Sequence, residues 1–351
     1  MCTLEGPRDS DLKRLGTILY VGDLSEGTTT LDRLKTLRIL GSSVVPFDTG
    51  PYLRGGSRIF RSLGWRFYAG PNVSELNRDL RNACKAWSNV KTIWIDKGVW
   101  IWKSTLAFLK ESLNAGAIHF TPDPAIVFHR SPHFLNSIPL YDHLFTFKDY
   151  EVELYRKYGA ARTHLLSMSY ESARFFPREP IAKYQCDVIF VGHKESHYVR
   201  HLREVAKLGV DLRIWGPGWD TSWYSPAWQR RCVRGSGIWG EEYPRALSSA
   251  KIGIGLLTKL APDLVTTRSL EIPACGTFML AESSPGHAQM FRDNEEAVLF
   301  NSPSDLAGKV RHYLAEGESR IRIADAGYQR CRLGKYSNEA RLREVLELAG
   351  T

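Results

Sequence analysis

The sequence has few cysteines, no long apolar run and no apolar segment at its start. Its six cysteines include no CxxC pair and no histidine at zinc-finger spacing, which argues against structural zinc and against a disulfide framework. The most apolar stretches, Ile93–Trp102 and Ile252–Leu257, fall well short of the roughly 20 residues that span a bilayer. Because Met1–Arg14 is polar and charged, we expect no signal peptide and a cytosolic (cytoplasmic) protein.

Composition indicates a globular chain with a modest positive charge. The 351 residues are 43% hydrophobic and 24% charged, enough for two domains with buried cores. Subtracting 38 acidic from 47 basic residues leaves +9, which suits an anionic small molecule, a phosphorylated acceptor, a membrane surface or nucleic acid. The basic residues are spread among acids without a nucleic-acid-binding motif, so we expect no nucleic-acid partner. Peripheral membrane association stays open, although we recognise no amphipathic anchor in the sequence.

Short apolar runs alternate with helical patterns along the whole chain, which predicts an α/β fold with parallel sheets. The pattern breaks over residues 166–185, where Pro177 and Pro180 indicate a linker, and a fresh strand follows. We therefore predict two Rossmann-like domains, residues 1–175 and 176–335. Residues 336–351 form a C-terminal helix that docks back against one of them. Ligands of open α/β sheets bind at the carboxyl ends of the strands, so two such domains facing each other leave one cleft.

The most informative stretch is 263–276, DLVTTRSLEIPACG, which follows an expected strand. It predicts a helix from about Thr267 to Ala274 that stops at Gly276. A carboxylate such as Glu271 on this helix can accept hydrogen bonds from both hydroxyls of a ribose. The helix start and Arg268 can hold a diphosphate.

The sequence resembles the CgeB-like (spore-maturation) glycosyltransferases, a family with the GT-B fold that is related to the group-one retaining glycosyltransferases. The resemblance covers about residues 16–335. It is carried by five runs: Tyr243–Gly255, Thr267–Leu280, Phe291–Phe300, His119–Pro124 and Ile138–His143.

The resemblance implies a nucleotide-sugar donor in the C-terminal domain and a hydroxyl acceptor in the N-terminal one. Glu271 matches the second glutamate of the relatives' two-glutamate motif, which binds the donor ribose. Asp263 stands where the first glutamate would be and is one methylene shorter. The other expected donor-binding residues are Arg268, Thr267, Gly192, His193, Lys194, Arg200 and Gly276.

In the N-terminal domain, the loop Gly22–Thr29 lacks both the P-loop pattern and the GxGxxG fingerprint. The resemblance makes Gly22 and Asp23 candidates for facing the acceptor. Asp96, Asp123 and His119 lie at or beside expected strand ends and are candidate catalytic residues that orient the acceptor hydroxyl. Asp96 or Asp123 would be the general base if the reaction inverts the donor configuration.

We expect a metal-independent, retaining transfer, because fixed positive charges can stabilise the departing diphosphate and no DxD flanked by strand residues is found. No cofactor is expected; the nucleotide-diphosphate sugar is a co-substrate. The alternatives are a nucleotide-sugar epimerase or hydrolase of the same fold, a non-catalytic nucleotide- or sugar-binding protein, and a nucleic-acid-binding protein.

Overall fold

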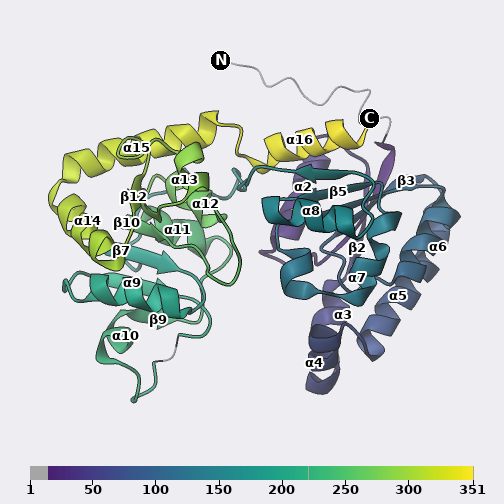
Figure 1. Ribbon diagram of the computed structural model, residues 1–351, viewed down its shortest axis with the longest axis horizontal. Helices are drawn as coiled ribbons and strands as arrows, with labels where there is room; N and C mark the ends of the chain where they lie inside the picture. Colours follow the sequence, from purple (N-terminus) through teal and green to yellow (C-terminus); the bar gives the residue numbers. More distant parts are fainter. Residues whose placement is uncertain (1–14, 220, 351) are drawn as a thin grey trace. The chain divides into compact units, whose positions relative to one another are not determined.

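The computed structural model describes residues 15–219 and 221–350, which form two compact units (Figure 1). Unit 1 consists of residues 15–167 together with 338–350, and unit 2 of residues 168–337. Each unit is built around a six-stranded parallel sheet. The predicted α/β class with two Rossmann-like domains is confirmed.

The sheet of unit 1 has the strand order β2-β1-β3-β4-β5-β6, and every neighbouring pair is parallel. The central strands are mostly apolar because helices cover both faces of the sheet. Its strands are β1 (Thr17–Gly22), β2 (Val44–Asp48), β3 (Val90–Asp96), β4 (Gly116–Thr121), β5 (His143–Thr146) and β6 (Thr163–Leu165).

The helices of unit 1 follow the strands in the usual α/β alternation. They are α2 (Thr29–Ile39), α3 (Gly50–Arg54), α4 (Arg58–Phe67), α5 (Pro71–Ala83), α6 (Lys103–Leu113), α7 (Pro132–Ser137), α8 (Asp149–Lys157) and α16 (Asn338–Ala349). Short turns add η1 (Cys84–Ala86), η2 (Ala125–His129) and η3 (Ile138–Leu140).

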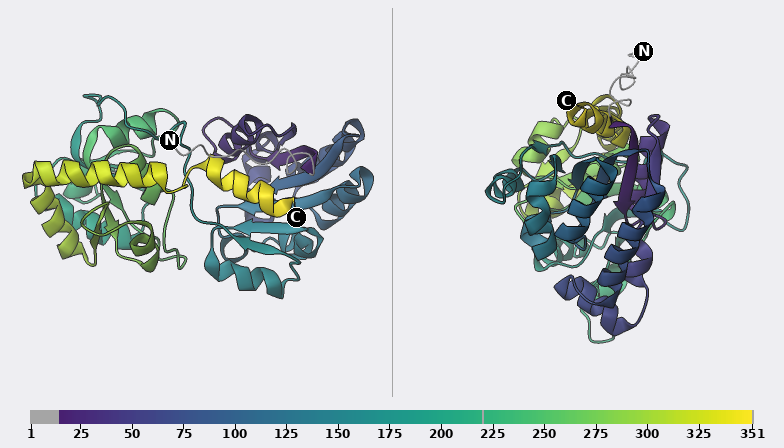
Figure 2. Two further views of the ribbon diagram at one scale, coloured as in Figure 1. Left: turned by 90° about the horizontal axis from the view of Figure 1, so that it is seen from above. Right: turned by 90° about the vertical axis from the view of Figure 1, so that its right-hand side faces the viewer.

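The C-terminal helix α16 belongs to unit 1, so the predicted docking of a terminal helix is confirmed (Figure 2). It packs against α2. Leu342, Val345 and Leu346 share one helical face and are fully buried. They join Leu34 and Leu37 of α2 in one apolar cluster, which covers one face of the sheet.

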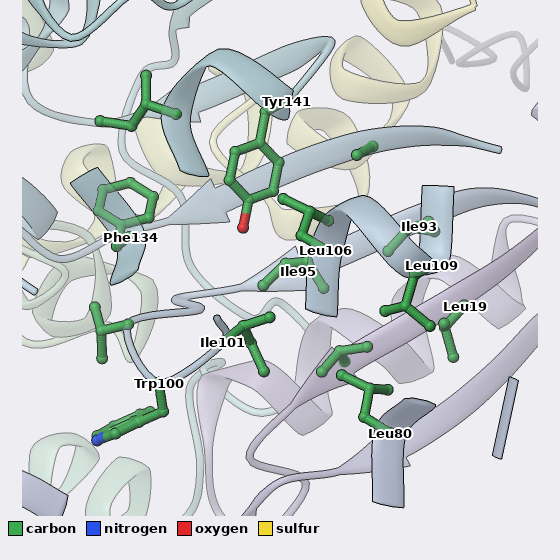
Figure 3. Close-up of a cluster of buried hydrophobic side chains, with 14 of the residues drawn as sticks. Leu19, Leu80, Ile93, Ile95, Trp100, Ile101, Leu106, Leu109, Phe134 and Tyr141 are labelled. Carbon is green, nitrogen blue, oxygen red and sulfur yellow. The ribbon is translucent and has the colours of Figure 1, made fainter. Parts of the chain in front are cut away.

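The main core of unit 1 lies on the opposite face of the sheet (Figure 3). Alternate residues of a strand point to opposite faces, so Leu19 and Ile93 enter this core. Ile18 and Trp94, their neighbours in the chain, point to the α2–α16 side. The side chains labelled in Figure 3 include Leu80 from α5 and Leu106 and Leu109 from α6.

The sheet of unit 2 has the order β12-β11-β10-β7-β8-β9 and is also parallel. Its strands are β7 (Cys186–Val191), β8 (Leu212–Trp215), β9 (Val233–Gly235), β10 (Ala250–Gly255), β11 (Phe278–Glu282) and β12 (Val298–Phe300). Its helices are α9 (Ser196–Ala206), α10 (Ala227–Cys232), α11 (Glu242–Ser248), α12 (Arg268–Ala274), α13 (Pro285–Met290), α14 (Pro303–Ala315) and α15 (Gly317–Leu333).

Each sheet has one point at which the chain reverses its direction of strand addition. In unit 1 the chain moves from β1 to β2 on one side, then crosses to β3 on the other. In unit 2 it moves from β7 through β8 to β9 and then crosses to β10, which is the other neighbour of β7. The loops at the carboxyl ends of such a strand pair diverge and leave a crevice, which is the usual ligand site of open α/β sheets.

We predict that Leu346→Ala lowers the free energy of unfolding by about 2–5 kcal/mol, because it leaves a cavity between α16 and unit 1. Urea unfolding followed by circular dichroism measures the change. The matched control is Leu333→Ala on α15, where the side chain is 79% exposed and a change within about 0.5 kcal/mol is expected. Equal effects of the two substitutions would contradict the docking of α16.

Candidate functional site

The Arg268 guanidinium lies at the reversal point of unit 2. Its Nη1 donates a hydrogen bond to the carbonyl of Val191, the last residue of β7, at 3.3 Å. Its Nη2 donates to the carbonyl of Leu256, which directly follows β10, at 3.4 Å. The Nε atom is buried and has no hydrogen-bond partner among the described residues. Arg268 thus spans the carboxyl ends of both strands with donor capacity left for an anion.

The loop after β7 is held close to this guanidinium. A Cβ added at Gly192 would lie 3.1 Å from Nη1 of Arg268. The Gly192 carbonyl accepts a hydrogen bond from the Trp219 indole at 2.9 Å. A Cβ at Gly216, whose φ is +154°, would come within 1.8 Å of the same carbonyl oxygen. Glycine is therefore required at 216 for the loops after β7 and β8 to meet.

The two basic residues after Gly192 are exposed. Nε2 of His193 lies 2.6 Å from Oε1 of Glu195. The amide of Lys194 donates to the Pro217 carbonyl at 2.9 Å, while its ammonium group lies 5.8 Å from the centre of the Trp219 ring. The backbone of this loop is thus fixed, and the Lys194 side chain is accessible to a ligand.

Glu271 is buried one turn after Arg268 on α12. Its Oε2 accepts a hydrogen bond from the Tyr243 hydroxyl at 3.1 Å. Burial raises the pKa of Glu271 above its ordinary value, although the Tyr243 hydrogen bond and the Arg268 charge act in the opposite direction. Residues three apart share a helix face, so Arg268 and Glu271 are neighbours on one side of α12.

The other donor-binding residues expected in unit 2 differ in their position and in their exposure. Thr267 directly precedes α12, and its carbonyl accepts a hydrogen bond from the Glu271 amide at 2.9 Å. Asp263 lies half-buried in the loop before α12. Arg200 is exposed on α9.

Gly276 is not brought together with Arg268. It follows the far end of α12, where its φ is +73° and its amide donates to the Pro273 carbonyl at 2.9 Å. It leads into the amino end of β11, which is the opposite edge of the sheet from the carboxyl ends of β7 and β10. Its role is to end the helix, because this left-handed conformation favours glycine.

The sequence analysis missed a polar cluster beside this site. Glu282, the last residue of β11, accepts a hydrogen bond from the Leu257 amide at 3.0 Å. It also pairs with His197 at 3.0 Å and with the Lys259 ammonium at 2.7 Å. These contacts tie the carboxyl ends of β10 and β11 together. The signal in the sequence was a glutamate directly after an apolar run, at an expected strand end.

Asp96 lies at the reversal point of unit 1, but its carboxylate is already fully engaged. Arg33 of α2 donates to it through Nε at 2.7 Å and through Nη2 at 2.9 Å, and both side chains are buried. The Tyr20 hydroxyl donates at 2.7 Å and the Thr30 hydroxyl at 3.3 Å. A carboxylate that compensates a buried guanidinium in this way is not free to take a proton from an acceptor, so the geometry favours a structural role over the expected catalytic one.

The position of His119 also argues against the expected catalytic role, because its ring is not accessible to a substrate. His119 is fully buried, its ring centre lies 4.4 Å from that of Phe134 in a tilted arrangement, and its Nε2 lies 3.2 Å from the Lys97 carbonyl. Its Nδ1 is buried without a hydrogen-bond partner among the described residues. Burial lowers the pKa of His119 to about 4, so the ring is neutral at physiological pH.

The other expected residues of unit 1 remain near the carboxyl edge of the sheet. The half-exposed Asp123 pairs with the Lys97 ammonium at 2.9 Å, joining the loops after β3 and β4. Asp23 pairs with Arg54 at 2.5 Å and accepts from the Ser25 hydroxyl at 2.7 Å. Gly22 ends β1, where a Cβ would lie 2.6 Å from Cγ2 of Thr30 and 3.1 Å from Cβ of Asp96.

The described residues contain neither a helix that could cross a membrane nor a side-chain group that could hold a metal ion. Across residues 15–219 and 221–350, no helix has the length and apolarity needed to cross a membrane. Within the same ranges, no three histidine, cysteine, aspartate or glutamate side chains are grouped so that they could hold a metal ion.

Part of unit 2 and most of α16 match a known protein family. Residues 195–347 match the family described as glycosyl transferase-like. No curated protein matches the chain in sequence.

Solved structures show the same fold over nearly the whole chain. Sucrose-phosphate synthase from Thermosynechococcus elongatus is 15% identical, with a TM-score of 0.62 over 95% of this chain and 98% of that one. HepE from Anabaena, solved with UDP and glucose, is 11% identical, with a TM-score of 0.61 over 96% of this chain and 100% of that one. The UDP-forming α,α-trehalose-phosphate synthase from Burkholderia vietnamiensis is 13% identical, with a TM-score of 0.59 over 95% and 100% of the two chains.

The chain therefore has the two-domain α/β fold of the GT-B glycosyltransferases, as the resemblance implied. More particularly, the segment of unit 2 that carries Arg268 and Glu271 lies within the glycosyl transferase-like match.

We predict that His119 makes the fold sensitive to acid. Its pKa is about 4 in the folded protein against an ordinary 6.5, so the protein gains stability from the neutral ring above pH 6.5. This stability is lost as the pH falls through 4. The full contribution is about 3 kcal/mol, from roughly 1.4 kcal/mol per pKa unit.

Urea unfolding of His119→Leu between pH 7 and 4 tests this expectation. The free energy of unfolding should fall less steeply with acid than in the wild type, whatever its starting value. The control is His312→Leu, whose imidazole is exposed. Parallel pH profiles for wild type and His119→Leu would contradict the burial of a neutral ring.

Proposed function

We propose that this protein is a glycosyltransferase that moves a sugar from a nucleotide-diphosphate sugar to a hydroxyl acceptor, with the donor bound by unit 2. The observation that carries the proposal is the Arg268 guanidinium at the carboxyl ends of β7 and β10. Its buried Nε has no partner among the described residues, at the point where open α/β sheets bind ligands. The glycosyl transferase-like match over residues 195–347 supports this reading.

The diphosphate is the part of the donor that this arrangement suits best. Glycosyl transfer develops negative charge on the departing diphosphate, and fixed positive groups lower the barrier by stabilising that charge. Arg268 supplies a planar fork of donors, and Lys194 supplies an accessible ammonium from the adjoining loop. Transfer without a metal ion is consistent with this chemistry and remains part of the proposal.

Glu271 is proposed to bind the ribose of the same donor. It lies one turn beyond Arg268 on the same side of α12, and the Tyr243 hydroxyl fixes one carboxyl oxygen. A carboxyl group oriented in this way can accept hydrogen bonds from vicinal hydroxyls. Asp263, at the position of the relatives' first glutamate, is proposed to face the transferred sugar.

Unit 1 is proposed to hold the acceptor at the carboxyl edge of its sheet. Of the expected catalytic residues there, Asp123 keeps a half-exposed carboxylate, whereas Asp96 and His119 are engaged or buried. Retention of the donor configuration, a CgeB-like subfamily and a cytosolic location stay predictions from the sequence. Because HepE was solved with UDP and glucose, UDP and UDP-glucose are the first donors to try.

We predict that Arg268→Ala weakens binding of both UDP and inorganic pyrophosphate by about 10- to 100-fold, because charge-assisted hydrogen bonds are worth roughly 1.5–3 kcal/mol. Glu271→Gln should weaken UDP without weakening pyrophosphate, because the proposed partner of Glu271 is the ribose and the loss of its negative charge beside Arg268 does not disfavour an anion. Isothermal titration calorimetry measures both. The matched control is Arg311→Ala, which removes an exposed arginine of unit 2 with the same change of charge.

The same titrations with ADP and GDP identify the base if UDP does not bind. Melting curves show whether each variant is folded. Arg268→Lys keeps the charge without the planar fork and should fall between wild type and Arg268→Ala. The proposed donor site would be refuted if no nucleoside diphosphate bound the folded wild type, or if Arg268→Ala bound as tightly as Arg311→Ala.

A further inference from the structure

Helix α4 (Arg58–Phe67) carries large apolar side chains that the described residues of unit 1 leave exposed. Ile59 is 70% exposed, Phe67 62% and Phe60 40%. Gly64 is the one residue of this ten-residue helix that is buried. Large exposed apolar side chains gathered on one short helix mark an interaction surface rather than random scatter.

Three of the four exposed apolar side chains of the helix, those of Ile59, Phe60 and Phe67, lie on one side together with the half-buried Leu63, and the fourth, Trp65, lies on another side. Ile59, Leu63 and Phe67 are spaced four residues apart, and Phe60 adjoins them on the same side. We call these four residues the α4 stripe. Figure 1 shows α4 at the end of unit 1, beyond α3 and away from the sheet.

The other exposed positions of the helix are Arg58, Ser62, Trp65 and Arg66, and Arg61 is partly exposed. Arg58, Arg61 and Arg66 lie on α4, and the helix carries no acidic residue. Among the described residues, none of the three arginines forms an ion pair. Arg61 donates to the Gly56 carbonyl at 2.8 Å. The positive charge beside the α4 stripe is therefore uncompensated.

Another side of α4, which carries Gly64 and Trp65, is fixed to the rest of unit 1, and this leaves the α4 stripe facing outward. The Trp100 indole donates to the Gly64 carbonyl at 3.0 Å, and the Trp65 ring packs edge-on against Trp100 at 4.8 Å. The Ser57 hydroxyl caps the start of the helix through the Phe60 amide at 3.3 Å. Tyr68, with a left-handed φ of +53°, ends it.

We propose that α4 docks unit 1 onto an anionic lipid bilayer, with the α4 stripe entering the boundary between headgroups and acyl chains. Amphipathic helices with arginines on the polar face and bulky apolar residues on the other bind membranes in this way. A stable protein partner would need about 800 Å² on each side, more than a few partly exposed side chains supply. No amphipathic anchor was recognised in the sequence, whereas in the structure α4 carries apolar side chains on one side and arginines beside them.

This docking is independent of the proposed transferase activity. It requires no nucleotide and no residue of unit 2. It would bring the carboxyl edge of unit 1 near a membrane surface, which favours acceptors exposed at that surface. The chemistry recognised is an anionic headgroup layer over acyl chains.

Vesicle flotation of the full chain tests the proposal without any nucleotide. The probes are vesicles of phosphatidylcholine alone and of phosphatidylcholine mixed with phosphatidylglycerol. We expect binding to the anionic vesicles only, and less of it in high salt. Arg58→Gln/Arg66→Gln should lower partitioning by roughly 30-fold, at about fivefold per arginine. Ile59→Ser/Phe67→Ser should lower it by about tenfold or more.

Two control variants match these changes on exposed positions of unit 2. Arg311→Gln/Arg322→Gln removes the same charge, and Ile321→Ser/Leu333→Ser removes exposed apolar side chains. Both should bind as the wild type does. The proposal is overturned if the wild type ignores anionic vesicles at low salt, or if the controls lose as much binding as the α4 variants. It is also overturned if light scattering shows that the α4 variants break a dimer without changing vesicle binding.

Discussion

The candidate donor site of unit 2 depends on the hydrogen bonds of the Arg268 guanidinium. This guanidinium is hydrogen-bonded to the carbonyls that end β7 and follow β10, so it fixes the geometry of the loops that diverge there. The same loops are tightened by Gly216, which allows the β8 loop to contact Gly192. Because the guanidinium is partly satisfied by carbonyls and forms no ion pair with a carboxylate of residues 15–219 or 221–350, its charge is available to an anion.

Unit 1 has the same architecture and uses its reversal point in the opposite way. There the buried guanidinium of Arg33 meets Asp96 with two hydrogen bonds, and Tyr20 and Thr30 complete the carboxylate's partners. Asp96 therefore compensates the Arg33 charge, which is not available to bind an anion as the Arg268 charge is. The two halves of one repeated fold therefore divide the proposed work, with the diphosphate assigned to unit 2 and the acceptor to unit 1.

Much of the fold was predictable because both sheets are parallel and buried on both faces. Runs such as Ile18–Val21 and Val188–Val191 are nearly all apolar and are followed by glycine, which is a strong strand signal. Among the three-residue edge strands, β6 (THL) and β9 (VRG) mix polar and apolar residues and carry no strand pattern, whereas β12 (VLF) is wholly apolar. Helix α15 carries a weaker sequence signal, because its buried residues are Ile323, Ala324, Gly327 and Cys331, and only Ile323 is a large apolar residue.

Site residues could be predicted from the sequence only where their position after a strand was enough to identify them. Arg268 and Glu271 followed from their place after an apolar run, but the Glu282 cluster depends on three elements meeting in space. Asp96 shows the limit most clearly. An aspartate at a strand end reads as available from the sequence, and only the arrival of Arg33 from α2 shows that it is already paired. Likewise, the exposure of α4 could not be known before its packing was.

Hydrogen–deuterium exchange with and without the nucleoside diphosphate that binds most tightly tests the central claim most directly. The account predicts that the ligand slows exchange in the segments 191–194 and 266–271. Exchange at 93–98, the matching edge of unit 1, should not change. Slower exchange at 93–98 with 191–194 and 266–271 unaltered would place the nucleotide in the wrong unit and contradict the account.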